Sequence, residues 1–171
     1  MPEIKNQKCP MCGKDKLTLT EEDYNIPHFG KCFLMTMHCD SCHYHISDVE
    51  SEENKGSIKI TFEVEKEEDM KVRVIKSSEA TVKIPQMRMS MEPGAASTGF
   101  LSNIEGLLNR FKKIIESERD NADDLSIRKK AKNLLKKLWK VELGDEKLKI
   151  IIEDPSGNSA IVSERAETKK L

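Results

Sequence analysis

Four cysteines in two C-x2-C pairs are the residues in this sequence best suited to chemistry. Cys9 and Cys12 stand in the run K-C-P-M-C-G-K, and Cys39 and Cys42 stand in the run C-D-S-C-H-Y-H. Two thiolates on one tight turn can reach a metal ion from the same side, and two such turns complete a tetrahedron of sulfur, which suits zinc. We therefore predict one structural Zn²⁺ bound by these four cysteines.

A closed shell of four sulfurs leaves no coordination position for water or substrate. The metal is therefore expected to stabilise the fold and to take no part in a reaction. Two other interpretations of the cysteines exist. Two disulfides would need an oxidising compartment, which nothing else in the sequence indicates. Iron–sulfur ligation is the second, but paired knuckles of this kind more often bind zinc.

Other residues with metal-binding or nucleophilic side chains lie close to these pairs. Cys32 has no activating neighbour except Lys31, so we expect a buried small apolar residue and not a reactive thiol. His43 and His45, with Glu50, invite a cupin-like metal site. They directly follow a predicted zinc ligand and no third histidine comes later in the chain, so this second site is not favoured.

Nothing in the sequence assembles a catalytic set. No nucleophile stands at motif spacing from a base, and the glycine-rich run 92–99 lacks the lysine and the spacing of a phosphate-binding loop. We therefore predict that the protein is not an enzyme. An enzyme acting in a cavity of the second domain is the weakest hypothesis.

The composition sets further bounds. The chain has 171 residues, of which 37% are hydrophobic and 35% charged, enough for a core under a heavily charged surface. Its net charge of -1 argues against a protein whose surface as a whole binds a polyanion such as nucleic acid. The sequence contains no run of about 18 apolar residues, so it predicts no membrane span. The polar N-terminus has no apolar signal core, and cysteines in metal spacing suit a reducing compartment, so we expect a cytoplasmic protein.

The cysteine pairs must be positioned by short strands. Residues 1–8 are interpreted as a polar lead-in. Alternation predicts a half-buried strand over 17–20, and a mostly apolar strand over 31–38 leads to the second pair. The segment 21–30, with its proline and glycine, is predicted to be a loop.

The polar run 50–56 is the best candidate for a domain boundary. It divides the chain into a zinc ribbon, 1–50, and a second domain, 51–171. Period-two alternation places Ile58, Ile60, Phe62 and Val64 on one strand face. Further strands are expected over 70–75, 80–84, 148–152 and 159–163. The polar tail from residue 164 is expected to be frayed.

A helical hairpin is predicted over about 100–142. Ser102 and Glu105 suggest a capping box for the first helix, and Asp123 or Asp124 caps the second. The predicted buried face of the second helix consists of Ile127, Ala131, Leu134, Leu135, Leu138 and Trp139. Its basic face consists of Arg128, Lys129, Lys130, Lys132, Lys136, Lys137 and Lys140. This basic helix, 126–140, either binds nucleic acid or is a solvated face, and the lack of interleaved aromatics favours the latter.

Several of these motifs, in this order, resemble the ZPR-type zinc-finger family over roughly residues 5–165. The segment between the knuckles ends in I-P-H-F-G-K-C-F-L-M-T-M-H, like the family's segment before its second cysteine pair. Residues 99–108, G-F-L-S-N-I-E-G-L-L, resemble a family signature, and so do residues 154–159, D-P-S-G-N-S. Eukaryotic members carry two modules in tandem, whereas this chain has one and is similar to short archaeal members. His43 stands where many members have glycine.

The resemblance implies a mainly β fold: a zinc ribbon joined to a double-stranded β-helix with an inserted helical hairpin. It also implies a partner, translation elongation factor 1-alpha, for a protein-binding adaptor or folding helper. A nucleic-acid-binding ribbon is the alternative, and the oligomeric state stays open. Residues in the two signatures are candidates for either fold geometry or partner contact: Gly99, Glu105, Gly106, Asp154, Pro155, Gly157 and Asn158.

Overall fold

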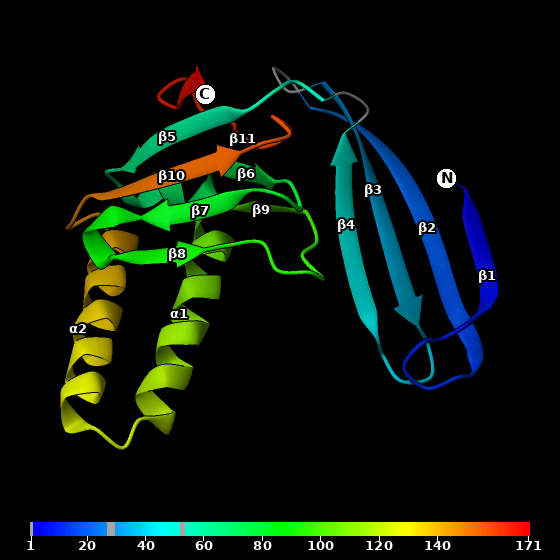
Figure 1. The fold of residues 1–171 in the computed structure, drawn as a ribbon, viewed down its shortest axis with the longest axis horizontal. Helices are drawn as coiled ribbons and strands as arrows, with labels where there is room; N and C mark the ends of the chain where they lie inside the picture. The colour runs from blue at the N-terminus through cyan, green and yellow to red at the C-terminus, as the bar shows by residue number, and fades with distance from the viewer. Residues whose placement is uncertain (1, 27–29, 52–53) are drawn as a thin grey trace.

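The computed structural model describes residues 2–26, 30–51 and 54–171, and it shows two parts of different architecture (Figure 1). The first part is a single antiparallel sheet with strand order β1-β2-β3-β4. The second part contains a five-stranded sheet, a three-stranded sheet and two helices. The prediction of a mainly β protein with a helical hairpin is confirmed. In the described part of the chain, no helix is long and apolar enough to cross a membrane.

The first sheet consists of long hairpins. Its strands are β1 (Glu3–Lys8), β2 (Asp15–Ile26), β3 (Gly30–Cys39) and β4 (His45–Ser51). The strand predicted over 31–38 is confirmed. The interpretation of residues 1–8 as a lead-in is wrong for Glu3–Lys8, which form β1 and pair with β2, while residue 1 lies outside the described residues. The loop predicted from residue 21 is wrong up to residue 26. Residues 27–29 of that loop lie outside the described residues.

The two wrong predictions have one physical reason. The backbone hydrogen bonds of a ladder do not depend on side-chain polarity, so a polar segment can join a sheet whose faces are open to water. All side chains of β1 are exposed, and all those described in β2 after Leu17 are exposed or half-buried. Periodicity of apolar residues therefore gave no signal there.

The second part begins after the predicted boundary 50–56, of which residues 52 and 53 lie outside the described residues. The division into 1–50 and 51–171 stays a prediction. The five-stranded sheet has the order β12 (Glu167–Lys170), β5 (Ile58–Val64), β10 (Leu148–Asp154), β7 (Thr81–Ile84) and β8 (Met89–Met91). The three-stranded sheet has the order β11 (Ala160–Ile161), β6 (Arg73–Lys76) and β9 (Phe100–Asn103). Short 3-10 helices, η1 (Glu67–Lys71) and η2 (Pro85–Met87), connect strands.

The core lies between the two sheets and the helices. The alternate residues of β5 predicted to share one face are all buried, and they pack with Ile150 and Ile152 of β10. Val74 and Ile161 from the smaller sheet join the same cluster. The strand predicted over 70–75 begins later than expected, because Met70 lies in η1.

The tail is also ordered differently from the prediction of a frayed end. Residues Glu167–Lys170 form β12, which pairs antiparallel with β5 from Glu167 opposite Thr61 to Lys170 opposite Ile58. Because β10 pairs with the other side of β5, the tail covers an edge that would otherwise be open.

The hairpin consists of α1 (Ile104–Asn121) and α2 (Leu125–Glu142), and it projects from one end of the two sheets (Figure 1). The predicted capping box is wrong: the side chain of Asn103, not Ser102, accepts the N–H of Gly106 at 2.8 Å. Ser102 is instead paired in β9, opposite Val74. Asp124 caps α2 as predicted, accepting the N–H of Ser126 at 2.7 Å.

The buried face of α2 is narrower than predicted. Ala131, Leu138 and Val141 are buried, whereas Trp139 is 58% exposed and Ile127 37% exposed. Because the hairpin projects beyond the sheets, α2 is covered mainly by α1 and η1, and one apolar stripe satisfies those contacts. Trp139 therefore lies on the surface.

Candidate metal centre

Two tight turns bring the four cysteines together at one end of the first sheet. One turn joins β1 to β2 and the other joins β3 to β4, side by side at the lower end in Figure 1. The Sγ atoms of Cys9 and Cys42 are 3.7 Å apart, and those of Cys12 and Cys39 are also 3.7 Å apart. All four sulfurs lie within 4.8 Å of one another. Four sulfurs each about 2.3 Å from a tetrahedral zinc are about 3.8 Å apart, so the site fits this ion.

The two turns have the same backbone geometry. In the first, the carbonyl of Cys9 accepts the N–H of Gly13 at 2.9 Å, and in the second the carbonyl of Cys39 accepts the N–H of His43 at 2.9 Å. Gly13 and His43 both have left-handed backbones, with φ of 70° and 57°. Glycine accommodates this conformation without strain, whereas a histidine in it is less favourable. The left-handed backbone therefore explains why a glycine would suit this turn better than His43 does.

The protonation of the thiols shows why a cation is needed. Burial opposes the Cys9 thiolate, but the N–H groups of Cys12 and Met11 outweigh it and lower the pKa of Cys9 to about 7. The N–H of Tyr44 favours the Cys42 thiolate, but lost solvation and the neighbouring thiols raise the pKa of Cys42 to about 12. Without a cation, the Cys42 thiol therefore stays protonated at neutral pH. A divalent ion removes this repulsion.

The metal also replaces a hydrophobic core in this part of the ribbon. Cys9, Leu17 and Cys39 are buried there, with Leu19 and Tyr44 partly buried beside them. So small a cluster contributes little burial, and metal binding supplies the missing folding free energy. Among the residues that the structure describes, the four cysteines are the one group able to hold a metal ion. The hypothesis of a second site at His43, His45 and Glu50 therefore gains no support.

The remaining cysteine has a different place. Cys32 is 2% exposed and packs with Val49 of β4 and Ile75 of β6, where the two parts of the chain meet. Partly buried side chains of both parts complete this junction: Leu34, Leu101, Ala160 and Val162. Burial raises the pKa of the Cys32 thiol, which disfavours the reactive thiolate. The prediction of a buried apolar residue is confirmed.

Gly99, the first candidate for partner contact, also lies at this junction. Its N–H donates to Oδ1 of Asp48 in β4 at 2.6 Å. A Cβ at this position would lie 2.6 Å from the carbonyl oxygen of Val49 and 3.0 Å from that of Lys76. Glycine is therefore required for the close approach of the two parts.

Glu105 and Gly106 lie at the start of α1, one short strand away from Gly99. The N–H of Gly106 is held by the Asn103 cap, and a Cβ there would collide with the Oγ of Ser102. Glu105 is exposed. Gly106 thus has a role in fold geometry, while Glu105 is free of such a constraint.

Asp154 organises the second signature. It is fully buried, and its carboxylate accepts the hydroxyl of Ser159 at 2.5 Å, and the hydroxyl and N–H of Ser156 at 2.7 and 2.9 Å. Burial disfavours the charged form, but these donors, with Ser77, outweigh burial and hold the pKa of Asp154 below its usual value. The carboxylate therefore fixes the turn.

The other members of that turn differ from one another. Gly157 has φ of 73°, and a Cβ there would collide with the carbonyl oxygen of Gly56. Pro155 is exposed, and Oδ1 of the half-buried Asn158 is enclosed without a hydrogen-bond partner among the described residues. Contact of any of the seven candidate residues with a partner protein stays a prediction.

The structure connects the two signatures through residues that the sequence did not single out. Ser159 accepts the N–H of Ser77 at 3.0 Å, and the preceding Lys76 lies against Gly99. Lys76 is 2% exposed, and burial lowers its pKa although the charge of Asp154 opposes this. A buried lysine leaves no trace in the pattern of apolar residues, so the sequence could not have indicated Lys76. Asp48, at the junction, was not among the predicted site residues either.

Comparison with known proteins agrees with both parts. A family model described as the ZPR1 zinc-finger domain matches residues 3–54, and one described as the ZPR1 jelly-roll domain matches residues 68–170. The jelly roll is the double-stranded β-helix that the resemblance implied, and the zinc-finger match together with the four sulfurs confirms the prediction of one zinc ion.

Individual relatives cover the chain from end to end. A ZPR1-like protein of Methanocaldococcus jannaschii is 35% identical over 172 residues, which are 100% of this chain and 87% of that protein. A ZPR1-like protein of Pyrococcus horikoshii is 35% identical over 99% of this chain and 78% of its own length. The zinc finger chaperone zpr1 of Schizosaccharomyces pombe is 35% identical over 90% of this chain, which corresponds to 33% of its own length.

Proposed function

Because this chain belongs to the ZPR1 zinc-finger family, we propose that it is a chaperone-like adaptor that binds translation elongation factor 1-alpha. The similarity to a Schizosaccharomyces pombe protein named a zinc finger chaperone, which spans both the ribbon and the jelly roll, supports the chaperone-like role. The partner is the one that the family resemblance of the sequence implies. We further propose that it acts without catalysis and in the reducing cytoplasm, where the four thiols stay available to zinc.

The ribbon has surface features of a protein-binding element. Large apolar side chains are exposed on it: Met11 is 71% exposed, Ile4 56%, Met37 39% and Tyr24 38%. Exposed apolar groups on a rigid support are typical of protein-interaction sites, and methionine adapts well to different partners. Zinc fixes the turn that presents Met11, so we expect partner binding to depend on the metal.

A pull-down with purified elongation factor 1-alpha, loaded with GTP or GDP, tests this proposal. The zinc-loaded chain should retain the factor, and Cys39→Ser or removal of zinc by a chelator should abolish retention. Cys32→Ala is the matched control, since it removes a thiol that does not face the metal site. If the zinc-loaded chain fails to bind in either nucleotide state, the partner is wrong. If binding persists after metal analysis shows an emptied site, the ribbon is not the contact.

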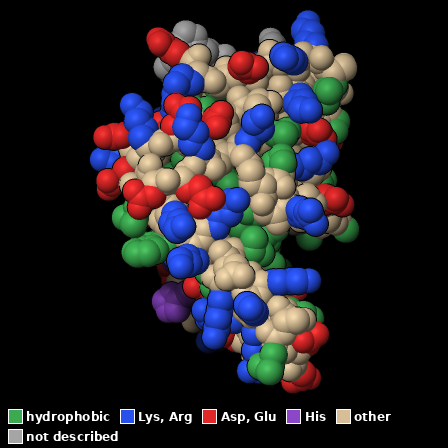
Figure 2. All heavy atoms as spheres, turned by 90° about the vertical axis from the view of Figure 1, so that its left-hand side faces the viewer, with side chains coloured by type: hydrophobic (Ala, Val, Ile, Leu, Met, Phe, Trp, Pro, Cys, Tyr) green, Lys and Arg blue, Asp and Glu red, His purple; other side chains and the backbone are tan. Residues whose placement is uncertain are grey.

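A second candidate function is nucleic-acid binding by α2. Trp139 is exposed beside the exposed Lys136 and Lys140, so the helix combines positive charge with an accessible aromatic ring. Figure 2 shows Lys and Arg side chains on the hairpin, as on the rest of this face. Single-stranded nucleic acid is bound by this combination of charge and stacking.

Binding of a labelled oligonucleotide at several salt concentrations decides between these functions. If α2 is the site, affinity should fall steeply with salt. Joint replacement of Lys136 and Lys137 by alanine should reduce the salt slope on a single strand by about 1.4, because each lost phosphate contact lowers it by about 0.7. Lack of any binding at low salt would remove this candidate.

A further inference from the structure

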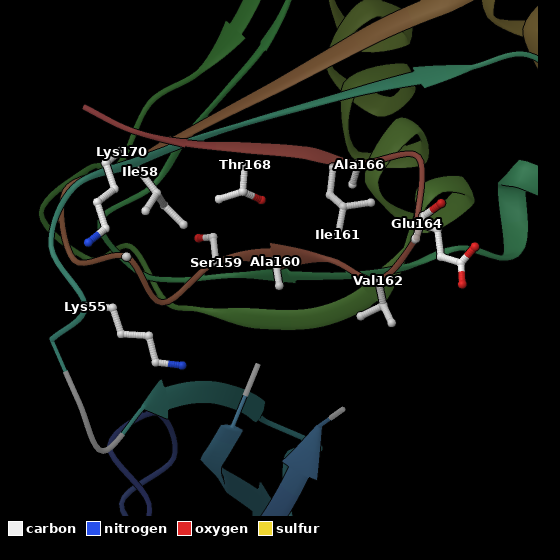
Figure 3. Close-up of a pocket in the computed structure, with 12 residues that line it drawn as sticks. Lys55, Ile58, Ser159, Ala160, Ile161, Val162, Glu164, Ala166, Thr168 and Lys170 are labelled. Carbon is white, nitrogen blue, oxygen red and sulfur yellow. The ribbon is translucent and has the colours of Figure 1, made fainter. Parts of the chain in front are cut away.

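A cleft of about 740 Å³ lies between β11 and β12, on the side of the jelly roll near the end of the first sheet (Figure 3). Ile58, Ile161 and Ala166 give it an apolar lining, and Ser159 and Thr168 add hydroxyl groups. Figure 3 shows Thr168 and Ser159 pointing toward one another across the cleft. Its size and mixed lining fit a binding site. The cleft adjoins the junction, to which Ala160 and Val162 of its lining also belong, and lies apart from the four cysteines.

The cleft follows the open edge of β11. Successive side chains of a strand point to opposite faces, yet all residues from 159 to 163 line the cleft, so it must lie along the edge. β11 ends the three-stranded sheet, and β12 ends the five-stranded sheet. Both strands therefore present one unpaired edge within the described part of the chain.

The backbone bonds of β11 show which group is presented. The N–H of Val162 donates to the carbonyl of Arg73 in β6 at 2.9 Å. In an antiparallel ladder, successive residues direct their N–H groups to opposite edges, so the N–H of Ile161 points away from β6 and into the cleft. This is the donor that an added strand would need.

Charge is distributed unevenly along the cleft. Lys55 and Lys170 lie at one end and Glu164 at the other (Figure 3). An extended chain with acidic side chains at one end would complement this arrangement, and its apolar side chains would contact Ile58 and Ile161. A compact small anion would reach the lysines but would leave the apolar wall and the strand edge unused.

We propose that this cleft binds an extended segment of a partner polypeptide, which pairs with β11 as an added strand and places acidic side chains beside Lys170. Strand addition gives affinity through backbone hydrogen bonds and specificity through alternate side chains. The inference rests on the proposed protein-binding function and names the kind of segment recognised.

The test uses the zinc-loaded full chain and a fluorescent synthetic peptide of alternating valine and threonine that ends in two glutamates. Fluorescence anisotropy should show binding at least about tenfold tighter than for the same peptide ending in two lysines. Lys170→Glu should abolish or reverse this preference. Lys169→Glu is the matched control, because the side chain of Lys169 alternates to the opposite face of β12.

Two further measurements separate strand addition from side-chain contact. Thr168→Trp should fill the cleft and block the peptide, whereas Lys169→Trp, with the same new side chain on the opposite face, should leave binding intact. Hydrogen exchange at the amide of Ile161 should slow when the peptide binds, because an added strand would accept that N–H.

Each contrary result has a definite meaning. Equal binding of the acidic and basic peptides, or unchanged exchange at Ile161, would overturn strand addition with acidic recognition. Displacement of the peptide by acetate or phosphate at matching concentration would assign a small-anion site instead. Self-association that Thr168→Trp abolishes, without peptide binding, would assign the cleft to a second copy. If the peptide does not bind but elongation factor 1-alpha is still retained, only this inference is wrong. If the peptide binds but the factor is not retained, only the proposed partner is wrong.

Discussion

The N–H of Gly99 donates to Oδ1 of Asp48 at 2.6 Å, and this bond joins the jelly roll to the last strand of the zinc ribbon. The same carboxylate oxygen accepts the N–H of Val49 at 2.9 Å. Because Cys32, Val49 and Ile75 are buried directly beside this bond, polar and apolar contacts support one another at the junction. The orientation of the ribbon thus depends on a glycine about fifty residues away in the chain.

Gly99→Ala should destabilise the protein by about 1–3 kcal/mol, because the new methyl group would overlap the carbonyl oxygen of Val49. Urea denaturation measures the change. Gly94→Ala is the control, since no atom lies within 4 Å of a Cβ there and its φ is not positive. We expect the control to change stability by less than about 0.5 kcal/mol. Equal midpoints for both variants would contradict the junction described above.

Removal of zinc should unfold the ribbon while the jelly roll keeps its structure. The cluster around Leu17 is small, whereas the jelly roll has its own core, which includes Phe62 and Ile150. Amide NMR spectra with and without a chelator should lose the dispersed signals of residues in β2 and β3 and keep those of β5 and β10. Metal analysis should give one zinc per chain before treatment. Loss of both sets of signals together would show that the jelly roll needs the metal too.

His43→Gly should tighten zinc binding slightly, by the equivalent of about 0.5–1 kcal/mol, because glycine accepts φ of 57° without strain. His43→Val should weaken it by about 1–2 kcal/mol, since a branched side chain is unfavourable in the left-handed region. Competition with a coloured chelator measures both. Loss of the metal in His43→Gly would instead show that the imidazole is a ligand of the metal.

Asp154→Asn should remove part of the dependence of stability on acid pH. The pKa of Asp154 is lower in the folded protein than the unfolded value of about 3.9, so its carboxylate stabilises the fold above about pH 4. That contribution is lost as the pH falls through the folded pKa. Urea denaturation at several pH values should therefore show wild type and variant converging in acid. Ser159→Ala, which removes one donor to the carboxylate, should give a smaller effect of the same sign.

Leu138→Ala and Trp139→Ala should have very different effects although the residues are neighbours. Leu138 is 1% exposed, so its truncation should cost about 2–5 kcal/mol, whereas Trp139 is 58% exposed and its loss should change stability by about 0.5 kcal/mol or less. Thermal or urea unfolding measures both. Trp139 is the single tryptophan of the chain, so quenching of its fluorescence by acrylamide gives an independent check. If acrylamide does not quench the fluorescence, Trp139 is buried and its exposed position is wrong.

Local patterns were sufficient for much of the architecture. The spacing of Cys9, Cys12, Cys39 and Cys42 indicated the metal centre, because two residues between a pair of thiols fit one tight turn. Alternation in β5 and the caps and apolar repeat of α2 indicated those elements, since period and capping are properties of neighbouring residues. The family signatures added the jelly-roll fold.

Other features depend on residues far apart in the chain. The polar segments β1 and β12 became strands because a neighbouring edge was open, and side-chain pattern does not record which edge is open. Trp139 lies on the surface because α1 covers only one stripe of α2. The sequence alone therefore determined the metal ligands and the classes of element, whereas the junction at Gly99 and the edge of β11 were decided by tertiary packing, because both depend on which surfaces meet and which stay uncovered.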